Sequence, residues 1–139
     1  SGDPNNFNLN DCSTQRNLSE EGREQAQKIG NFFEKNKIKI EKVFSSEWCR
    51  CKETAEIAFK DYSTKNFLNS FYSSKYAKNK KKQIEELDNF VKQLKSSKNL
   101  VFVTHYVLIS EVLNYAPSSG EIVVSDKNFN MIGSIEINY

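Results

Sequence analysis

The chain has 139 residues, the length of one domain, so we expect residues 1–139 to form a single domain. The net charge of +2 is too small to indicate a nucleic-acid or membrane-surface partner. No apolar run approaches the roughly 20 residues of a membrane span, and no signal peptide is visible. Because the chain opens with Ser-Gly-Asp-Pro rather than Met, we expect that something has been removed upstream.

The cysteines, Cys12, Cys49 and Cys51, fit no zinc pattern and no disulfide framework. A sequence so poor in cysteine indicates a cytoplasmic protein, and an exported protein whose leader has been removed is the alternative. Cys49 is the one candidate for a cysteine nucleophile, but ordinary helix packing is the favoured interpretation because the Cys-x5-Arg loop of cysteine phosphatases is absent. No Gly-rich phosphate loop, dinucleotide fingerprint or metal-ligand cluster appears.

The first half of the chain predicts a loop, a helix, a strand and a second helix. Residues 1–17 are polar and rich in turn formers, which indicates a loop. Ser19 is the predicted N-cap of a helix that runs to about Asn36, because glutamates follow it and apolar residues recur at helical spacing. A turn at residues 37–41 precedes a short buried strand at residues 43–45, and a helix is expected from about Trp48 to Phe59.

The second half predicts a helix, a strand, a short helix and a hairpin. Residues 60–79 mix aromatic residues with Ser, Asn and Lys and indicate a lid or an irregular loop. A lysine-rich run at residues 78–82 precedes an amphipathic helix whose apolar positions run from Ile84 to Leu94. A strand at residues 100–104 and a helix at residues 107–113 follow. Strands at 121–125 and 131–137 are expected to pair as a hairpin. This alternation predicts a three-layer α/β/α fold with a mostly parallel sheet.

Two residues follow predicted strands in positions suited to binding an anion. His105, the one histidine, ends the apolar run at residues 100–104, at the sheet edge where open α/β folds bind ligands. Arg50 falls in the first turn of a helix after the strand at residues 43–45, where backbone N–H groups and a guanidinium favour phosphate. Both residues also have a plainer interpretation: Arg50 as a surface arginine and His105 as a core histidine with satisfied nitrogens. Arg16, in the loop before the first helix, is likewise typical of a surface arginine.

Three motifs in order resemble the histidine phosphatase superfamily, in its phosphoglycerate-mutase-like branch. Residues 18–26 are similar to the family's Leu-Thr-x-x-Gly-x-x-Gln-Ala helix start. Residues 43–55 contain its Ser-x-x-x-Arg-x-x-x-Thr-Ala segment, and residues 100–105 resemble the strand that ends in the second active-site histidine. The resemblance runs from about Asp11 to Val124. The small size and the absence of an inserted cap domain resemble the compact SixA-like phosphohistidine phosphatases.

The resemblance implies a phosphoglycerate-mutase-like fold and a metal-independent phosphatase that needs no cofactor and works through a phosphohistidine. Arg50 would clamp the phosphate and His105 would contact the transferred phosphoryl group, with Arg16 and Thr104 as expected substrate-binding residues. The implied partner is a phosphorylated small molecule or a phosphoprotein, and neither nucleic acid nor membrane. The alternatives are a non-catalytic member of the fold that binds a phosphorylated ligand, and an unrelated small α/β binding domain.

The family's nucleophile is a different histidine, in an Arg-His-Gly motif that closes the first strand upstream of the Leu-Thr helix. None of Arg16, Arg23 and Arg50 precedes a histidine, so this strand is expected just before Ser1. Three explanations are open: the strand has been cut off, it is left out of the sequence, or it was never present. The intact remaining motifs favour the first two, because a sheet without its central strand exposes unpaired edges and an apolar face.

An alkoxide leaving group needs a proton, so a general acid is expected in a phosphoester hydrolase. The candidates are Asp61, Glu85, Glu86 and Asp88, and the last three are typical of a solvated helix face. Cleavage of a P–N bond releases a better leaving group and depends less on protonation by a general acid. We therefore expect a phosphohistidine or another activated phosphoester as substrate.

Overall fold

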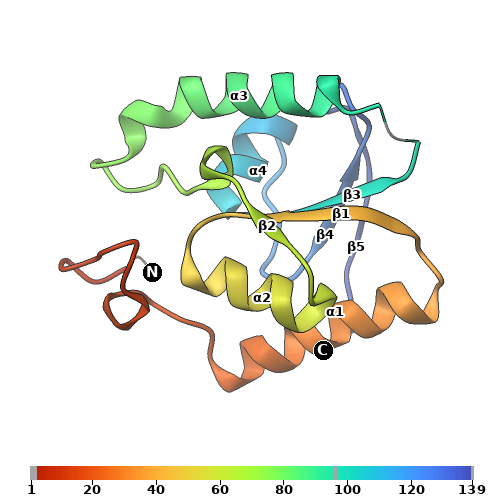
Figure 1. The fold of residues 1–139 in the computed structure, drawn as a ribbon, viewed down its shortest axis with the longest axis horizontal. Coiled ribbons are helices and arrows are strands. Elements are labelled where there is room, and N and C mark those ends of the chain that lie inside the picture. Colours follow the sequence, from red (N-terminus) through yellow and green to blue (C-terminus); the bar gives the residue numbers. More distant parts are fainter. Residues whose placement is uncertain (1–2, 96, 139) are drawn as a thin grey trace.

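A parallel three-stranded sheet forms the centre of the molecule in the computed structural model, which describes residues 3–95 and 97–138. Strand β1 (Ile40–Ser45) lies between β2 (Ser63–Thr64) and β3 (Asn99–Val103). Val43, Phe44 and Ser45 of β1 are buried, whereas the apolar residues of β3 are half-buried. The predicted mostly parallel sheet is confirmed (Figure 1).

Four helices complete the three layers. Helices α1 (Glu20–Lys35) and α2 (Cys49–Phe59) cover one face of the sheet. Helices α3 (Lys80–Gln93) and α4 (Tyr106–Leu113) cover the other face (Figure 1). None of the helices in the described residues is long and apolar enough to cross a membrane.

Local signals fix the start of α1 and its packing on α2. The Ser19 hydroxyl accepts a hydrogen bond of 3.1 Å from the Gly22 amide, so Ser19 is the N-cap, as predicted. Gly30 then lets the two helices approach closely, because a Cβ there would lie 2.4 Å from the Ala58 carbonyl oxygen. The two helices form one layer as a result.

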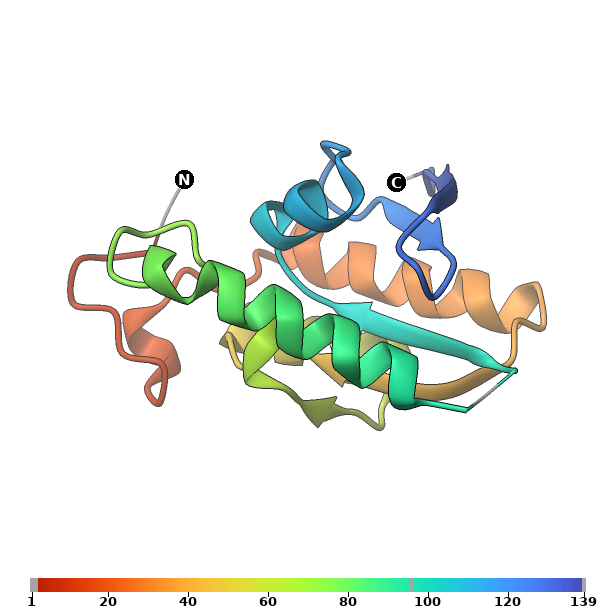
Figure 2. The same cartoon turned by 90° about the horizontal axis from the view of Figure 1, so that it is seen from above.

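The C-terminal hairpin lies apart from the central sheet. Strand β4 (Ile122–Ser125) pairs antiparallel with β5 (Met131–Ile135), which confirms the predicted hairpin. Figure 2 shows this hairpin beyond β3, on the side away from β1. Among the described residues, neither strand of the hairpin pairs with the three-stranded sheet.

Two segments differ from the sequence predictions. The turn expected at residues 37–41 is shorter, because β1 already begins at Ile40. Residues 60–79 are more ordered than a lid: they contain β2 and a short 3-10 helix, η2 (Asn66–Leu68). Two side chains of this helix, Phe67 and Leu68, are buried in a cluster that joins the sheet to α3 and α4. Its other members are Phe44, Phe71, Leu87, Val91 and Leu108.

Candidate functional site

The carboxyl ends of β1 and β3 meet at one edge of the sheet. Ser45 pairs with Val103 at this edge, and the Ser46 amide donates a hydrogen bond of 2.9 Å to the Val103 carbonyl. The chain then continues from β1 into α2 and from β3 into His105. The parallel register therefore brings together the two segments that the sequence singled out.

His105 is buried at this edge and held by its neighbours. Its Nε2 lies 2.8 Å from the Ser46 hydroxyl, and its ring packs edge-on against Trp48 with centroids 5.2 Å apart. Burial, followed by the nearby Arg50 charge, lowers the pKa of His105 to about 3. The imidazole is therefore neutral at neutral pH and has a fixed orientation.

The guanidinium of Arg50 forms an ion pair that the sequence did not predict. Its NH1 lies 2.9 Å from Oδ1 of Asp3, and the two side chains are only 21% and 17% exposed. The same Oδ1 accepts a hydrogen bond of 3.0 Å from the Arg16 amide, and Oδ2 accepts one of 3.1 Å from the Trp48 indole. Three N–H donors, one from the N-terminal loop and two from the start of α2, thus converge on one carboxylate, so a negatively charged group is accommodated beside Arg50.

Arg16 and Thr104, the other predicted binding residues, border the same space. The Arg16 carbonyl lies 3.5 Å from NH1 of Arg50. The Thr104 hydroxyl donates a hydrogen bond of 2.6 Å to the Leu68 carbonyl, so it fastens the end of β3 to η2. The structure therefore places all four predicted residues around one region, with the Thr104 hydroxyl engaged by the backbone.

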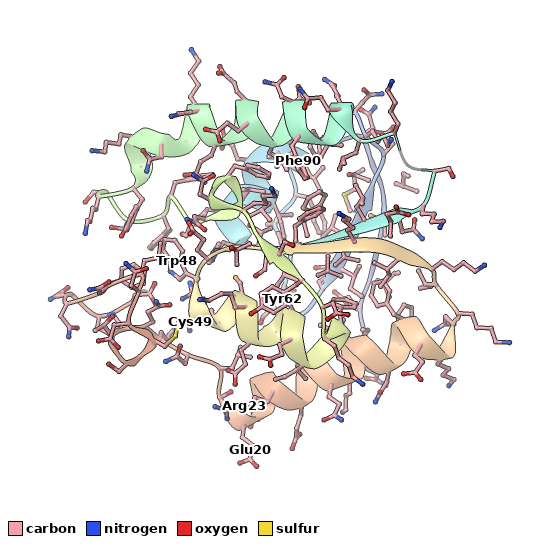
Figure 3. All side chains as sticks on the ribbon, viewed as in Figure 1. Glu20, Arg23, Trp48, Cys49, Tyr62 and Phe90 are labelled. Carbon is pink, nitrogen blue, oxygen red and sulfur yellow. A yellow bond between two sulfur atoms is a disulfide. The ribbon has the colours of Figure 1, made fainter. Side chains whose placement is uncertain are left out.

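A disulfide joins Cys12 to Cys49, so the prediction that the cysteines fit no disulfide framework is wrong. The two residues are 37 positions apart, and sequence spacing carries no signal for such a pair. The bond ties the N-terminal loop to the start of α2, beside Trp48 (Figure 3). Cys49 has no free thiol, and burial raises the pKa of the Cys51 thiol to about 12, so neither is a nucleophile at neutral pH.

A groove of about 1710 Å³ runs from this site between β3 and the hairpin. Its outer end is bordered by Asp3, Arg16, Trp48, Arg50 and His105. Apolar side chains line the rest, among them Ala26, Ile29, Leu100, Phe102, Ile122 and Val124. In the described part of the chain β3 pairs only with β1, and β4 only with β5, so each of these strands has one unpaired edge, and both strands border the groove.

The four carboxylates predicted as general acids lie elsewhere. Asp61 follows the end of α2, and Glu85, Glu86 and Asp88 lie on α3. None of the four is among the described residues that border the groove, and Asp88 pairs with Lys92 at 2.9 Å. No group of three or more His, Cys, Asp or Glu residues within the described ranges could hold a metal ion.

Comparisons with known proteins agree with the fold and with part of the sequence. The family model of the histidine phosphatase superfamily (branch 1) matches residues 10–69. The structure of TTHB049 from Thermus thermophilus superposes with a TM-score of 0.64 at 18% identity, covering 87% of this chain and 85% of that one. Rv3214 from Mycobacterium tuberculosis superposes with a TM-score of 0.51 at 15% identity, covering 72% and 68%.

No curated protein matches the sequence. The matched segment nevertheless contains the first two motifs, with Arg16 and Arg50, and the two solved structures share the arrangement of the sheet and helices. The predicted resemblance is confirmed: residues 10–69 match the histidine phosphatase superfamily, and the chain has the histidine phosphatase fold.

Proposed function

We propose that this protein is a phosphatase that passes a phosphoryl group to a histidine and then to water. The substrate is a small phosphoester or a phosphohistidine. The observation that carries the proposal is the convergence of Arg50 and His105 at the carboxyl ends of β1 and β3, where the Asp3 carboxylate pairs with Arg50. The superfamily match supports phosphatase or mutase chemistry in general terms.

Arg50 and His105 have complementary roles in this proposal. The guanidinium binds two phosphate oxygens and neutralises charge that develops as the phosphoryl group moves. Ser46 holds Nε2 of His105, so the ring enters the reaction already oriented. A phosphate dianion beside the ring raises the pKa of His105, and the protonated ring then donates a hydrogen bond to a phosphoryl oxygen.

The nucleophile is proposed to lie on a strand N-terminal to Ser1 that carries Arg-His-Gly. The apolar groove between β3 and β4 supports this proposal, because a strand there would pair with both unpaired edges. If it ran parallel to β3, its carboxyl end would arrive beside Arg50 and His105. A histidine at that end would face a phosphate bound by Arg50.

The disulfide provides information on the cellular compartment in which the protein acts. Such bonds persist in oxidising compartments and are rare in the cytoplasm. The Cys12–Cys49 bond therefore favours an exported protein over the cytoplasmic location expected from the sequence. We propose that the protein acts outside the cytoplasm.

Trapping the phosphoenzyme tests the proposed reaction. The full-length protein is incubated with p-nitrophenyl phosphate, quenched in alkali and measured by intact mass and peptide mapping. We expect the mass to rise by one phosphoryl group on a histidine upstream of Ser1, and the adduct to be lost in acid, as a P–N bond requires. Arg50→Ala should abolish the adduct.

Arg23→Ala is the matched control, because Arg23 pairs with Glu53 on an exposed surface at 3.1 Å. It should leave the adduct unchanged. Phosphate binding that depends on Arg50, without turnover or an adduct, would instead establish the non-catalytic alternative. Phosphate affinity that is equal in wild type and Arg50→Ala would show that the site is assigned wrongly.

A further inference from the structure

The carboxylate of Asp3 is the acidic group built into the candidate site. It lies 2.9 Å from Arg50 and borders the groove together with Arg16, Trp48 and His105. Each of its oxygens accepts a hydrogen bond from a donor fixed by the fold, the Arg16 amide or the Trp48 indole. The disulfide beside Trp48 anchors the loop that carries Asp3, so the position of this carboxylate is set by the folded structure.

The charges around Asp3 change when a phosphate arrives. In the free protein, partial burial alone would raise the pKa of Asp3, but hydrogen bonds from Trp48 and the Arg16 amide, together with Arg50, outweigh burial and lower it. The neutral ring of His105 and the buried thiol of Cys51 add no charge. A bound phosphate dianion shares the Arg50 guanidinium and adds negative charge nearby, so the carboxylate gains affinity for a proton.

We propose that Asp3 is the general acid of this site and that the substrates therefore include unactivated alkyl phosphates. This inference rests on the proposed function and widens the substrate class expected from the sequence, where no carboxyl group was placed beside the phosphate. The acids predicted from the sequence lie outside the groove, whereas Asp3 lies next to the phosphate-binding arginine. A general acid must lie within reach of the leaving group, and Asp3 would lie beside a phosphate bound to Arg50.

The proton transfers balance in both half-reactions. As the bond between phosphorus and the ester oxygen breaks, the electron pair stays on that oxygen, which takes the proton of the Asp3 carboxyl and leaves as an alcohol. The phosphoryl group bonds to the nitrogen of the nucleophilic histidine. Water then attacks phosphorus, its proton returns to the Asp3 carboxylate, and the P–N bond breaks to release phosphate and free histidine.

Two substrates with different leaving groups test the role of Asp3. The kcat/KM of the full-length protein is measured on glycerol phosphate, whose alkoxide needs a proton, and on p-nitrophenyl phosphate, whose leaving group does not. Asp3→Asn keeps an oxygen that accepts from Arg50 and the Arg16 amide. We expect a loss of about 100-fold or more on glycerol phosphate and of less than about 5-fold on p-nitrophenyl phosphate.

The pH profile gives a second readout. Wild-type kcat on glycerol phosphate, which reports the protein with substrate bound, should fall as the pH rises and Asp3 ionises, and this fall should be absent in Asp3→Asn. Asp11→Asn is the matched control in the same loop, because its side chain caps Ser13 at 3.1 Å through an oxygen that asparagine retains. It should behave as wild type on both substrates.

The other outcomes overturn the proposal in distinct ways. Equal losses on both substrates in Asp3→Asn would mean that Asp3 only positions Arg50. Faster turnover with tighter phosphate inhibition would mean that Asp3 blocks the site. If the wild type hydrolyses p-nitrophenyl phosphate but not glycerol phosphate, the acid role fails while the proposed function stands. If it hydrolyses neither substrate and forms no phosphohistidine, both fail.

Discussion

Protonation of His105 makes the free energy of unfolding depend on pH. Its pKa falls from 6.5 to about 3 in the folded protein, chiefly through burial. Between these values the unfolded chain binds a proton that the folded chain does not. The free energy of unfolding therefore decreases as the pH is lowered through this window, by at most about 1.4 kcal/mol per pH unit from this residue.

Substitution His105→Gln should remove this contribution, because an amide does not titrate and its end can still reach Ser46. We expect the free energy of unfolding of the variant to vary less between about pH 6.5 and pH 3 than that of the wild type. Urea unfolding at several pH values in this range, for both proteins, measures the difference. Parallel curves would mean that His105 is protonated in the folded protein.

At the residue scale the sequence predicts the side chains placed directly after a strand and misses those that a distant loop delivers. Arg50 and His105 could be assigned to one edge because each comes soon after an apolar strand. Asp3 could not, because its partner Arg50 is 47 positions away and the loop around it contains several other Asp and Asn residues. Nothing in the local pattern separates one loop carboxylate from another.

The contact between α1 and α2 depends on one glycine. A Cβ at Gly30 would lie 2.4 Å from the Ala58 carbonyl oxygen and 3.0 Å from its Cα, and backbone cannot move aside cheaply. We expect Gly30→Ala to lower the free energy of unfolding by about 1–3 kcal/mol. Gly133→Ala is the control, because a Cβ there meets nothing within 4 Å, and it should change stability by less than about 0.5 kcal/mol. Equal changes in stability for the two variants would mean that α1 and α2 can move apart at this contact without cost.

The disulfide stabilises the link between the N-terminal loop and α2. It joins residues 37 positions apart, and the resulting loss of entropy in the unfolded chain corresponds to about 3–4 kcal/mol of stability. We expect the double variant Cys12→Ser and Cys49→Ser to lose that much in urea unfolding without reductant. Reductant should destabilise the wild type to the same level and leave the variant unchanged. A wild type whose stability does not change with reductant would mean that the bond does not form in solution.

At the element scale, periodic patterns could be read from the sequence and irregular ones could not. The helices at α1 and α3 have a clear apolar face, and the hairpin has alternating strands with a polar turn between them. Strand β2 has two exposed residues, and the 3-10 helix η2 is too short for any periodicity. Both are positioned by contacts with β1 and α3, which are remote in sequence.

For the whole molecule, the groove separates two sheets whose facing edges are unpaired within the described residues. Unpaired edges beside an apolar surface favour pairing with a further strand. The proposed strand upstream of Ser1 would join β3 to β4 and turn the two sheets into one. The proposal therefore makes a prediction about backbone hydrogen bonds that does not depend on catalysis.

Amide hydrogen exchange tests it. In the full-length protein, the amides on the unpaired edges of β3 and β4 would donate hydrogen bonds to the new strand. We therefore expect them to exchange at least about 100-fold more slowly than in a chain limited to residues 1–139. Amides of β1 are the internal control, since this strand already has a partner on each side and should be protected in both chains. A shortened chain that does not fold, beside a full-length protein that does, would support the same conclusion. Equal exchange along β3 and β4 in two folded chains would mean that no strand enters the groove, and the nucleophile would then have to come from elsewhere.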